Sequence, residues 1–381
     1  MTAARAATAL VALAGAMVGL AGAPGSAPAA PAAGWTVQHV PRTPGGTLVG
    51  VSCTSPRACM AVGSYSGHTL RLLTERWNGS RWSIVRARLP AGAIQGGFND
   101  VSCTSASACT AVGDYDINAR QTNVLVERWN GSRWSIQSAL DQAGVPVSVL
   151  SGVSCASARA CTAVGEYGSP PNTPPFVLIE HWNGSRWSIQ PTPGASGREG
   201  FLSGVSCTAP GACTAVGGSA NGRPRIERWN GVAWRLQHTP SVANGDQAFF
   251  SAVSCTSATA CTAVGTDGTG PALFPLAQGW NGRRWSSQSA RIAGDDFTSV
   301  SCTAPRACTA VGDASGGAQT LTAAWDGSRW SVQPSPQAPD NRTNQTLFDV
   351  SCTSRSICFA VGGVNRSSNG TAVGPLIERR S

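Results

Sequence analysis

The sequence predicts an all-β fold, a seven-bladed β-propeller of four-stranded blades with one disulfide per blade. Seven cysteine pairs recur, and their first cysteines lie 47 to 52 residues apart. Six copies contain four short runs with strand character, whereas the last copy contains three, and its missing run is found near the N-terminus. A repeat of about 50 residues built from short strands is typical of propeller blades.

Residues 1–29 are predicted to be a secretory signal. Arg5 supplies the positive start, an apolar run extends from Ala7 to Ala23, and Ala27-Pro28-Ala29 offers a small-residue cleavage site. A retained membrane anchor is the alternative, although the run is at the short end of the ~17–25 residues of a spanning helix. We expect residues 30–381 to form one propeller domain that is secreted, extracellular and free of the membrane.

The cysteines of each pair are separated by five residues, which suits a bond across a tight hairpin. An exported chain with fourteen cysteines is typical of disulfide formation. Zinc is the alternative, but zinc sites favour closer pairs with four ligands, and the four histidines do not recur in the repeats. We therefore expect seven disulfides and no metal. The pairs are Cys53/Cys59, Cys103/Cys109, Cys155/Cys161, Cys207/Cys213, Cys255/Cys261, Cys302/Cys308 and Cys352/Cys358.

The second copy illustrates the four predicted strands. The first ends at Val101–Cys103, the second covers Cys109–Gly113, the third Val124–Trp129 and the fourth Arg133–Ile136. β-Branched and aromatic residues favour strands, and Gly, Pro, Asn and Ser bound them. Asn130-Gly131 joins the last two strands, because Asn and Gly tolerate the positive φ angles of a tight hairpin turn.

The seventh copy is incomplete, since it ends with Arg380 where other copies have tryptophan. Its missing run matches Gly34–Gln38, so we expect the N-terminal strand to complete the last blade and close the ring without a free edge. Small residues fill the first two runs, and all thirteen tryptophans fall at two positions of the outer runs. We interpret the tryptophans as packing residues, with sugar stacking as the alternative.

Motifs for catalysis are scarce. There is no His-Glu-x-x-His, and the protease-like stretch 312–317 is interrupted by Ala314. Asp114–Asn118 places oxygen ligands as a calcium loop does, but Ala119 and Leu125 replace its glycine and glutamate. We predict no catalytic residue and no cofactor. The net charge is +9 and comes from arginines at repeated positions, so we expect it to be spread around the molecule and expect no nucleic-acid partner.

Loops on the two faces of the predicted propeller differ. The turns inside each hairpin are nearly identical between copies, whereas the other connections are individual, as at 85–100, 114–123, 166–175, 266–275 and 334–346. Variable loops on a rigid scaffold usually carry specificity. The candidate ligand-binding residues on this face are Tyr65, Asp100, Asp114, Tyr115, Glu166, Tyr167, Asp313 and Asp349. The alternative is that each is a solvated turn residue.

The repeated phrases at 101–113 and 127–137 resemble those of a group of exported actinobacterial β-propeller repeat proteins, with an architecture similar to kelch and galactose-oxidase propellers. The resemblance covers the mature chain and implies no catalytic residue. We predict a monomeric, non-catalytic binding protein for an extracellular glycan or protein. The alternatives are a glycan hydrolase or lyase with carboxylates at the channel mouth, and a structural envelope protein.

Overall fold

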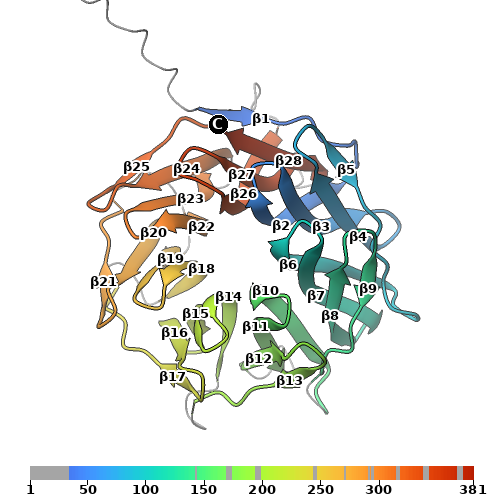
Figure 1. Ribbon diagram of the computed structural model, residues 1–381, viewed down its shortest axis with the longest axis horizontal. Helices are drawn as coiled ribbons and strands as arrows, with labels where there is room; N and C mark the ends of the chain where they lie inside the picture. The colour runs from blue at the N-terminus through green and yellow to red at the C-terminus, as the bar shows by residue number, and fades with distance from the viewer. Residues whose placement is uncertain are drawn as a thin grey trace, which may run out of the picture. The chain divides into compact units, whose positions relative to one another are not determined.

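The chain forms 28 β-strands and no helix within the residues that the structure, a computed structural model, describes (Figure 1). These residues are 34–141, 144–168, 174–193, 199–242, 247–269, 272–290, 292, 296–314, 318–337, 343–366 and 372–381. They belong to one compact unit. The predicted signal segment 1–29 lies outside the described residues.

The strands are arranged as seven antiparallel meanders of four, named here the first to seventh sheets in chain order. The first sheet has the order β2-β3-β4-β5, and each following sheet repeats it. One parallel pair, Val147↔Thr122, joins the second sheet to the third. The innermost strands are β2 (Gly46–Ser55), β6 (Gln95–Ser105), β10 (Val147–Ser157), β14 (Gly200–Ala209), β18 (Ala248–Ser257), β22 (Asp296–Ala304) and β26 (Thr343–Cys352).

The second strands contain the Cys-Thr-Ala-Val-Gly runs and are longer than predicted. In the second sheet this strand continues five residues beyond Gly113, because Tyr115 and Asp116 pair with Asn123 and Thr122. The predicted loop 114–123 is therefore mostly strand. The second strands are β3 (Ala58–Ser66), β7 (Ala108–Asn118), β11 (Ala160–Gly168), β15 (Ala212–Ser219), β19 (Ala260–Thr269), β23 (Ala307–Ala314) and β27 (Cys358–Arg366).

The third strands carry buried apolar residues and, in six sheets, end at the first tryptophan of the outer pair. The seventh sheet ends at Arg380 instead, as the sequence predicts. The third strands are β4 (Leu70–Trp77), β8 (Gln121–Trp129), β12 (Phe176–Trp182), β16 (Pro224–Trp229), β20 (Ala272–Trp280), β24 (Gln319–Trp325) and β28 (Ala372–Arg380).

The fourth strands are three residues long and begin with tryptophan. In the seventh sheet this strand is β1, which lies beside β28 in the register Trp35↔Arg380, so the predicted pairing of the two chain ends is present (Figure 1). The fourth strands are β5 (Trp82–Ile84), β9 (Trp134–Ile136), β13 (Trp187–Ile189), β17 (Trp234–Leu236), β21 (Trp285–Ser287), β25 (Trp330–Val332) and β1 (Trp35–Val37).

A cysteine pair lies at the same edge of every sheet, and an Asn-Gly or Asp-Gly turn lies beside it in the first six; we call this edge the turn edge. In the outer turns the glycine has a positive φ, 96° at Gly79, and the Asn78 side chain accepts hydrogen bonds from the backbone N–H groups of Ser80 and Arg81. The Asn-Gly prediction is thus confirmed in geometric detail.

All seven predicted disulfides are present, each between cysteines that lie opposite each other on the first and second strands of one sheet. The prediction of pairing within each repeat is therefore confirmed. The bonded pairs are Cys53–Cys59, Cys103–Cys109, Cys155–Cys161, Cys207–Cys213, Cys255–Cys261, Cys302–Cys308 and Cys352–Cys358.

The second cysteine of each disulfide is buried, whereas the first is half-buried. A disulfide sulfur has no proton to donate, so the threonine hydroxyl of the preceding sheet donates to it, as Thr110 does to Cys161 Sγ at 3.7 Å. These contacts tie five of the seven disulfides to the preceding sheet. The other pairs of this kind are Thr162–Cys213, Thr214–Cys261, Thr262–Cys308 and Thr309–Cys358.

A serine hydroxyl connects each innermost strand to the next. The Val-Ser-Cys serine accepts a hydrogen bond, 2.9–3.0 Å long, from the backbone N–H of the first cysteine in the following sheet. The seventh of these bonds runs from Cys53 of the first sheet to Ser351 of the last. The donor and acceptor pairs are Cys103–Ser52, Cys155–Ser102, Cys207–Ser154, Cys255–Ser206, Cys302–Ser254, Cys352–Ser301 and Cys53–Ser351.

The hydrophobic core lies between neighbouring sheets and within their outer halves. Alanine, valine and cysteine fill the inner strands, and tryptophan pairs such as Trp77–Trp82, with ring centroids 5.7 Å apart, fill the outer ones. Eleven of the thirteen tryptophans are buried, and Trp229 and Trp280 are half-buried, which supports the packing interpretation. Among the described residues, no helix has the length and apolarity needed to cross a bilayer.

Candidate functional site

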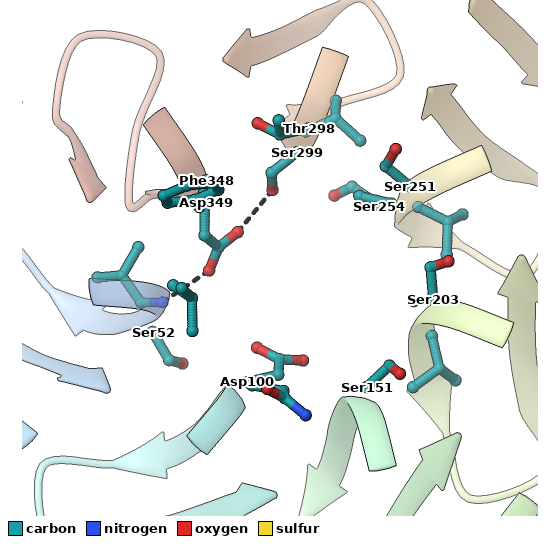
Figure 2. Close-up of a pocket in the computed structure, with 18 residues that line it drawn as sticks. Ser52, Asp100, Ser151, Ser203, Ser251, Ser254, Thr298, Ser299, Phe348 and Asp349 are labelled. Carbon is teal, nitrogen blue, oxygen red and sulfur yellow. Dashed lines mark hydrogen bonds between the residues drawn. The ribbon is translucent and has the colours of Figure 1, made fainter. Parts of the chain in front are cut away.

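The innermost strands surround one polar cavity of about 370 Å³ (Figure 2). Every one of the seven strands contributes to its wall, from β2 through β26. Seven of the eighteen lining residues are serine or threonine, and Figure 2 shows Ser151, Ser203 and Ser251 on one side with Asp100 and Asp349 on the other. The cavity therefore combines hydroxyl groups with two carboxyl groups.

A β-bulge in each innermost strand aims a side chain at the cavity. The pairing register of β10 with β11 skips one residue between Leu150 and Gly152, so Ser151 is left without a partner. A bulge bends its strand and re-aims the extra side chain, and bulges are common beside functional sites. The bulged residues are Val49, Asn99, Ser151, Ser203, Ser251, Thr298 and Phe348, and all seven line the cavity.

Asp349 is fixed by three hydrogen bonds at the wall of the cavity. Its Oδ2 accepts one from the Val51 backbone N–H at 2.6 Å, and its Oδ1 accepts one from the Ser299 hydroxyl at 2.5 Å and one from the Val350 backbone N–H at 2.8 Å. Burial raises the pKa of Asp349 to about 6, although these hydrogen bonds work in the opposite direction. The carboxyl group is thus held rigidly and titrates near neutral pH.

Asp100 occupies the same repeat position in the second sheet. Its Oδ2 accepts a hydrogen bond from the Val153 backbone N–H at 2.8 Å, and its Oδ1 accepts one from Val101 at 2.7 Å. Burial and the negative charge of Asp349 raise the pKa of Asp100 well above its usual range.

The two carboxyl groups flank the first sheet, where the equivalent residue is Gly50. An added Cβ at Gly50 would lie 2.9 Å from Asp100 Cα, so a side chain would not fit there. Asp100 and Asp349 were predicted to precede their strands on the loop-rich face. The structure places both inside the strands β6 and β26, because these strands begin several residues earlier than predicted.

The other predicted acidic residues do not line this cavity. Asp114 lies behind it and accepts a hydrogen bond at 3.0 Å from the Asn99 side chain, which does line it. Burial raises the pKa values of Asp114 and Glu166, the latter within β11. Asp313 pairs in register with Asp296 inside the sixth sheet. All three residues are in strands and not in the loops where they were expected.

The three predicted tyrosines pack between sheets. Tyr65, Tyr115 and Tyr167 each contact a hydrophobic cluster, and Tyr167 stacks on Phe176 with ring centroids 5.6 Å apart. None of the three lines the central cavity. Tyr65 does line a second hollow, of about 340 Å³, together with Arg71 and Arg88.

The disulfide cysteines contribute to the scaffold and not to the central cavity. None of the fourteen lines the central cavity. The second cysteines belong to the hydrophobic clusters between sheets, where Cys161, Cys213 and Cys308 are at most 3% exposed. They are therefore structural residues, because burial keeps them from any ligand in the cavity.

The carboxylates of 114–118, the stretch compared above with a calcium loop, make other contacts. The two oxygens of Asp116 accept hydrogen bonds from the Gln95 side chain and the Thr122 hydroxyl, both 2.7 Å long. In the part of the chain that the structure describes, no group of three or more His, Cys, Asp or Glu residues is placed to hold a metal ion. The donor set therefore fits the strand pairing of β7 with β8 better than an ion.

Sequence reasoning missed the bulged hydroxyl residues. Ser151, Ser203 and Ser251 precede Val-Ser-Cys by two residues, and this repeated small polar position was the available signal. The positions were not recognised, because the extra residue of a bulge appears only when both strands are paired. The serines of Val-Ser-Cys were interpreted only as small residues of the first run, whereas each accepts a hydrogen bond from the next sheet.

Comparison with known proteins identifies the fold. No family model matches the chain, and no curated protein matches it. YCF48 bound to D1 peptide is similar at 14% identity with a TM-score of 0.58, over 93% of this chain and 97% of that one. YCF48 from Cyanidioschyzon merolae is 17% identical with a TM-score of 0.55, over 92% and 99% of the two chains.

A GH74 xyloglucanase from Xanthomonas campestris is also similar, at 13% identity and a TM-score of 0.55, over 90% of this chain and 55% of the enzyme. At these identities the likeness is one of fold. The protein is an all-β protein with a β-propeller fold and seven disulfides.

Proposed function

We propose that this protein is an exported, non-catalytic binding protein whose central cavity takes a sugar unit of an extracellular glycan. The observation that carries the proposal is the cavity of about 370 Å³ walled by the bulged residues of all seven innermost strands. Pockets that hold small ligands usually measure about 300–1,000 Å³. A volume at the lower end of that range suits one or two sugar rings.

The chemistry of the wall also suits a sugar. Sugar hydroxyl groups donate and accept hydrogen bonds, and serine hydroxyls such as Ser203 and Ser251 can do both. The ionised Asp349 offers a strong acceptor, because hydrogen bonds to charged groups are about twice as strong as those between neutral groups. Phe348 adds an aromatic side chain on the same wall. Both carboxyl groups already accept backbone hydrogen bonds from the next sheet, which favours a role in binding over one in turnover.

The proposal includes a closed ring of seven blades. Its supports are the pairing of β1 with β28 and the hydrogen bonds from Val51 and Cys53 of the first sheet to Asp349 and Ser351 of the last. In a closed ring every innermost strand has a neighbouring sheet on both sides, which keeps the cavity wall rigid. A preorganised wall lowers the entropic cost of holding a ligand.

Export is the second part of the proposal. Seven disulfides and no free cysteine among the described residues suggest an oxidising compartment. With the signal at 1–29, we propose that residues 30–381 act outside the cell as one monomeric domain. Mass spectrometry of the secreted protein tests this directly, and a mature N-terminus far from residue 30 or free thiols would contradict it.

Glycan-array screening of the secreted protein, followed by calorimetry with the best glycan, tests the binding role. The cavity-filling variant Ser203→Phe should abolish binding, because a phenyl ring would occupy the space of the ligand. The fold should tolerate it, since Phe348 occupies the equivalent position in the seventh sheet. A matched control is Ser135→Phe, on the exposed face of β9, which should bind as the wild type does.

A second candidate function is glycan hydrolysis or lysis. One observation favours it, namely that two buried carboxyl groups with raised pKa values line one cavity, and carboxyl groups with shifted pKa values supply the acid and the base of many active sites. Incubation of the bound glycan with the protein, with release of reducing or unsaturated ends as the readout, decides between the two. Turnover that disappears in both Asp100→Asn and Asp349→Asn would establish the enzyme and overturn the non-catalytic role.

A further inference from the structure

Ten of the 28 arginines of the chain lie at the turn edge. The turns between first and second strands and between third and fourth strands contain ten exposed arginines, six of them Arg57, Arg283, Arg284, Arg306, Arg329 and Arg355. The repeated sequence positions do spread arginine over the sheets, as expected. They also place it at one edge, because both hairpin turns of a four-stranded meander leave the sheet on the same side.

The inner and outer turns of one sheet lie against each other. A Cβ added to Gly79 of the outer turn would lie 3.0 Å from Arg57 Cβ of the inner turn. The same holds in the sixth sheet, where a Cβ added to Gly327 would lie 2.8 Å from Arg306 Cβ. The arginines of the two turns therefore belong to one surface.

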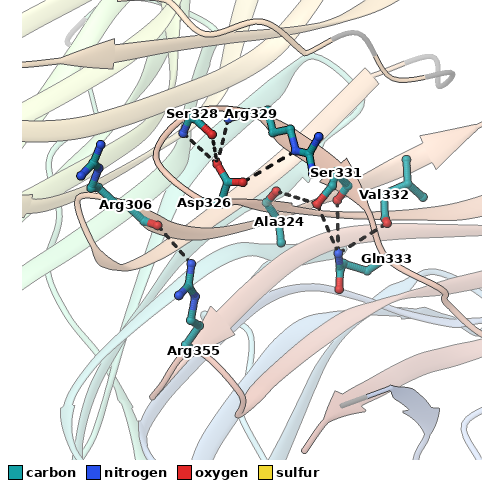
Figure 3. Close-up of polar contacts among 9 residues, drawn as sticks. All are labelled: Arg306, Ala324, Asp326, Ser328, Arg329, Ser331, Val332, Gln333 and Arg355. Atoms are coloured by element: carbon teal, nitrogen blue, oxygen red, sulfur yellow. Dashed lines mark hydrogen bonds and ion pairs between the residues drawn. The ribbon is translucent and has the colours of Figure 1, made fainter. Parts of the chain in front are cut away.

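Hydrogen bonds join the turns of neighbouring sheets as well. The guanidinium of Arg128 donates to the Ala158 carbonyl of the next inner turn at 2.6 Å, and that of Arg228 donates to the Ala258 carbonyl at 2.5 Å. Arg355 of the seventh sheet donates to the Arg306 carbonyl of the sixth at 3.4 Å (Figure 3). These hydrogen bonds join the turn edges of the second and third, the fourth and fifth, and the sixth and seventh sheets.

Few negative charges oppose these arginines. Asp326 is the single carboxylate in the inner and outer turns, all of which the structure describes. Its Oδ1 accepts hydrogen bonds from the Ser328 hydroxyl and from the backbone N–H groups of Ser328 and Arg329, which lower its pKa to about 2 (Figure 3). Its ion pair with Arg329 is long, 3.8 Å, and exposed, so it contributes little.

We propose that the turn edge is a docking surface for a linear polyanion, a polymer whose phosphate or carboxylate groups recur along its length. Guanidinium forks match the geometry of phosphate and carboxylate oxygens, which is the advantage of arginine over lysine at such sites. The positive charges recur from the fifth sheet through the sixth and seventh to the first. A polymer with recurring charges can engage several of them in succession.

The fourth sheet interrupts this surface. Its turns, 208–212 and 230–233, contain no arginine, and Val232 is 84% exposed there. A polymer should therefore follow the sheets on either side of the fourth. The surface is separate from the central cavity, so the failure of one proposal does not affect the other.

The test is binding of long-chain polyphosphate and of polygalacturonate to the secreted protein, followed by calorimetry at several salt concentrations, with dextran as the neutral polymer. The triple variant Arg306→Gln, Arg329→Gln, Arg355→Gln should lose about tenfold or more in affinity at low salt. Its plot of log affinity against log salt should be shallower by about 2, since each charge contact to a flexible polyanion contributes about 0.7 to the slope. The two polymers distinguish phosphate from carboxylate as the preferred group.

The matched control carries the same loss of charge at the other edge of the sheets. Arg120, Arg223 and Arg366 are exposed and lie at or beside the β7–β8, β15–β16 and β27–β28 connections. Their triple glutamine variant should bind the polymers within about twofold of the wild type. As a gain of function, Ala233→Arg in the arginine-free outer turn of the fourth sheet should strengthen binding.

Two results would overturn the proposal. Equal weakening by the test and control triple variants would show that net charge alone attracts the polymer. Tighter binding to phosphatidylglycerol vesicles than to either polymer would assign the surface to a membrane. Intact folding of both variants is verified by an unchanged melting temperature, which is expected because all six arginines are exposed.

Discussion

The turn edge and the opposite edge of the sheets, here the loop edge, are held together by different chemistry. At the turn edge each sheet has a disulfide, and six sheets have a capped Asn-Gly or Asp-Gly turn. The segments that run between sheets toward the loop edge are anchored differently, by glutamates inside the third strands, as where Glu180 accepts a hydrogen bond from Leu140 N–H at 3.3 Å. Disulfides and local hydrogen bonds thus stabilise the turn edge, and ionisable groups stabilise the segments that lead to the loop edge.

This difference explains why the two edges carry different information. A covalent hairpin tolerates no change in length, so its sequence is nearly the same in each sheet. A segment anchored by one buried carboxyl group can vary in length and composition around that anchor. The sequence at the loop edge can therefore differ from sheet to sheet. The turn edge instead presents similar residues in each sheet, so that their effects add up over the sheets.

The seventh sheet offers the strongest test, because no turn joins β28 to β1 and packing replaces it. Trp35→Ala should destabilise the protein by about 4 kcal/mol, since it leaves a large cavity beside Val311 and Leu347. Val37→Ala, on the exposed side of the same strand, should cost less than about 0.5 kcal/mol. Denaturant unfolding measures both. Equal effects would mean that β1 contributes backbone pairing alone.

Alkaline pH should loosen the loop edge. Burial raises the pKa of Glu180 from its usual 4.5 to about 7. Because the folded state holds the proton more tightly, the contribution of Glu180 is complete below about pH 4.5 and is lost as pH rises through about 7. The stability of wild type relative to Glu180→Gln should fall by about 3 kcal/mol between pH 4.5 and pH 8.

Gln278 occupies the equivalent position in the fifth sheet, so glutamine fits this site. Unfolding at a series of pH values gives the difference between the two proteins. If that difference does not depend on pH, Glu180 remains ionised in the fold and the account of the loop edge is wrong. The protection of the amides near Leu140, measured relative to their intrinsic exchange rate at each pH, should fall as pH rises in the wild type and stay constant in the variant.

Removing one disulfide should act at the other edge. Cys255→Ser combined with Cys261→Ser should cost about 2 kcal/mol, because the bond closes a short loop. Faster amide exchange should be confined to the turn edge of the fifth sheet and its neighbours. Exchange that rises equally at Leu140 would contradict separate anchoring of the two edges.

Glycine substitution provides the smallest contrast. Gly79→Ala should cost about 1 kcal/mol, because its φ is 96° and the new Cβ would lie 3.0 Å from Arg57 Cβ. Gly67, at the β3–β4 connection of the loop edge, has only Thr69 O nearby at 3.7 Å, so Gly67→Ala should change stability by less than about 0.5 kcal/mol. Thermal melts of the two variants compare them.

Local and repeated features of the fold could be predicted from the sequence. The cysteine pairs, the Asn-Gly turns and the match of Gly34–Gln38 to the missing strand each depend on a few neighbouring residues or on comparison between copies. Strand lengths were underestimated, because pairing extends β7 through residues that have turn character, such as Asp114 and Asp116.

The site could be predicted only in part. Asp100 and Asp349 were identified, but as loop residues beside three tyrosines, whereas they lie in strands on a wall of hydroxyl groups. The bulges that aim Ser151 and its equivalents inward depend on the register between two strands, which no single run reveals. The gathering of arginine at one edge likewise depends on topology, since residues that are spread evenly in sequence meet in space.

A crystal structure of the protein with the strongest ligand from the glycan array tests the central claim most directly. The account predicts a sugar ring in the central cavity, hydrogen-bonded to Asp349 and to hydroxyl groups such as Ser203 and Ser251. A ligand located in the hollow beside Tyr65 and Arg88, with the central cavity holding only solvent, would contradict it.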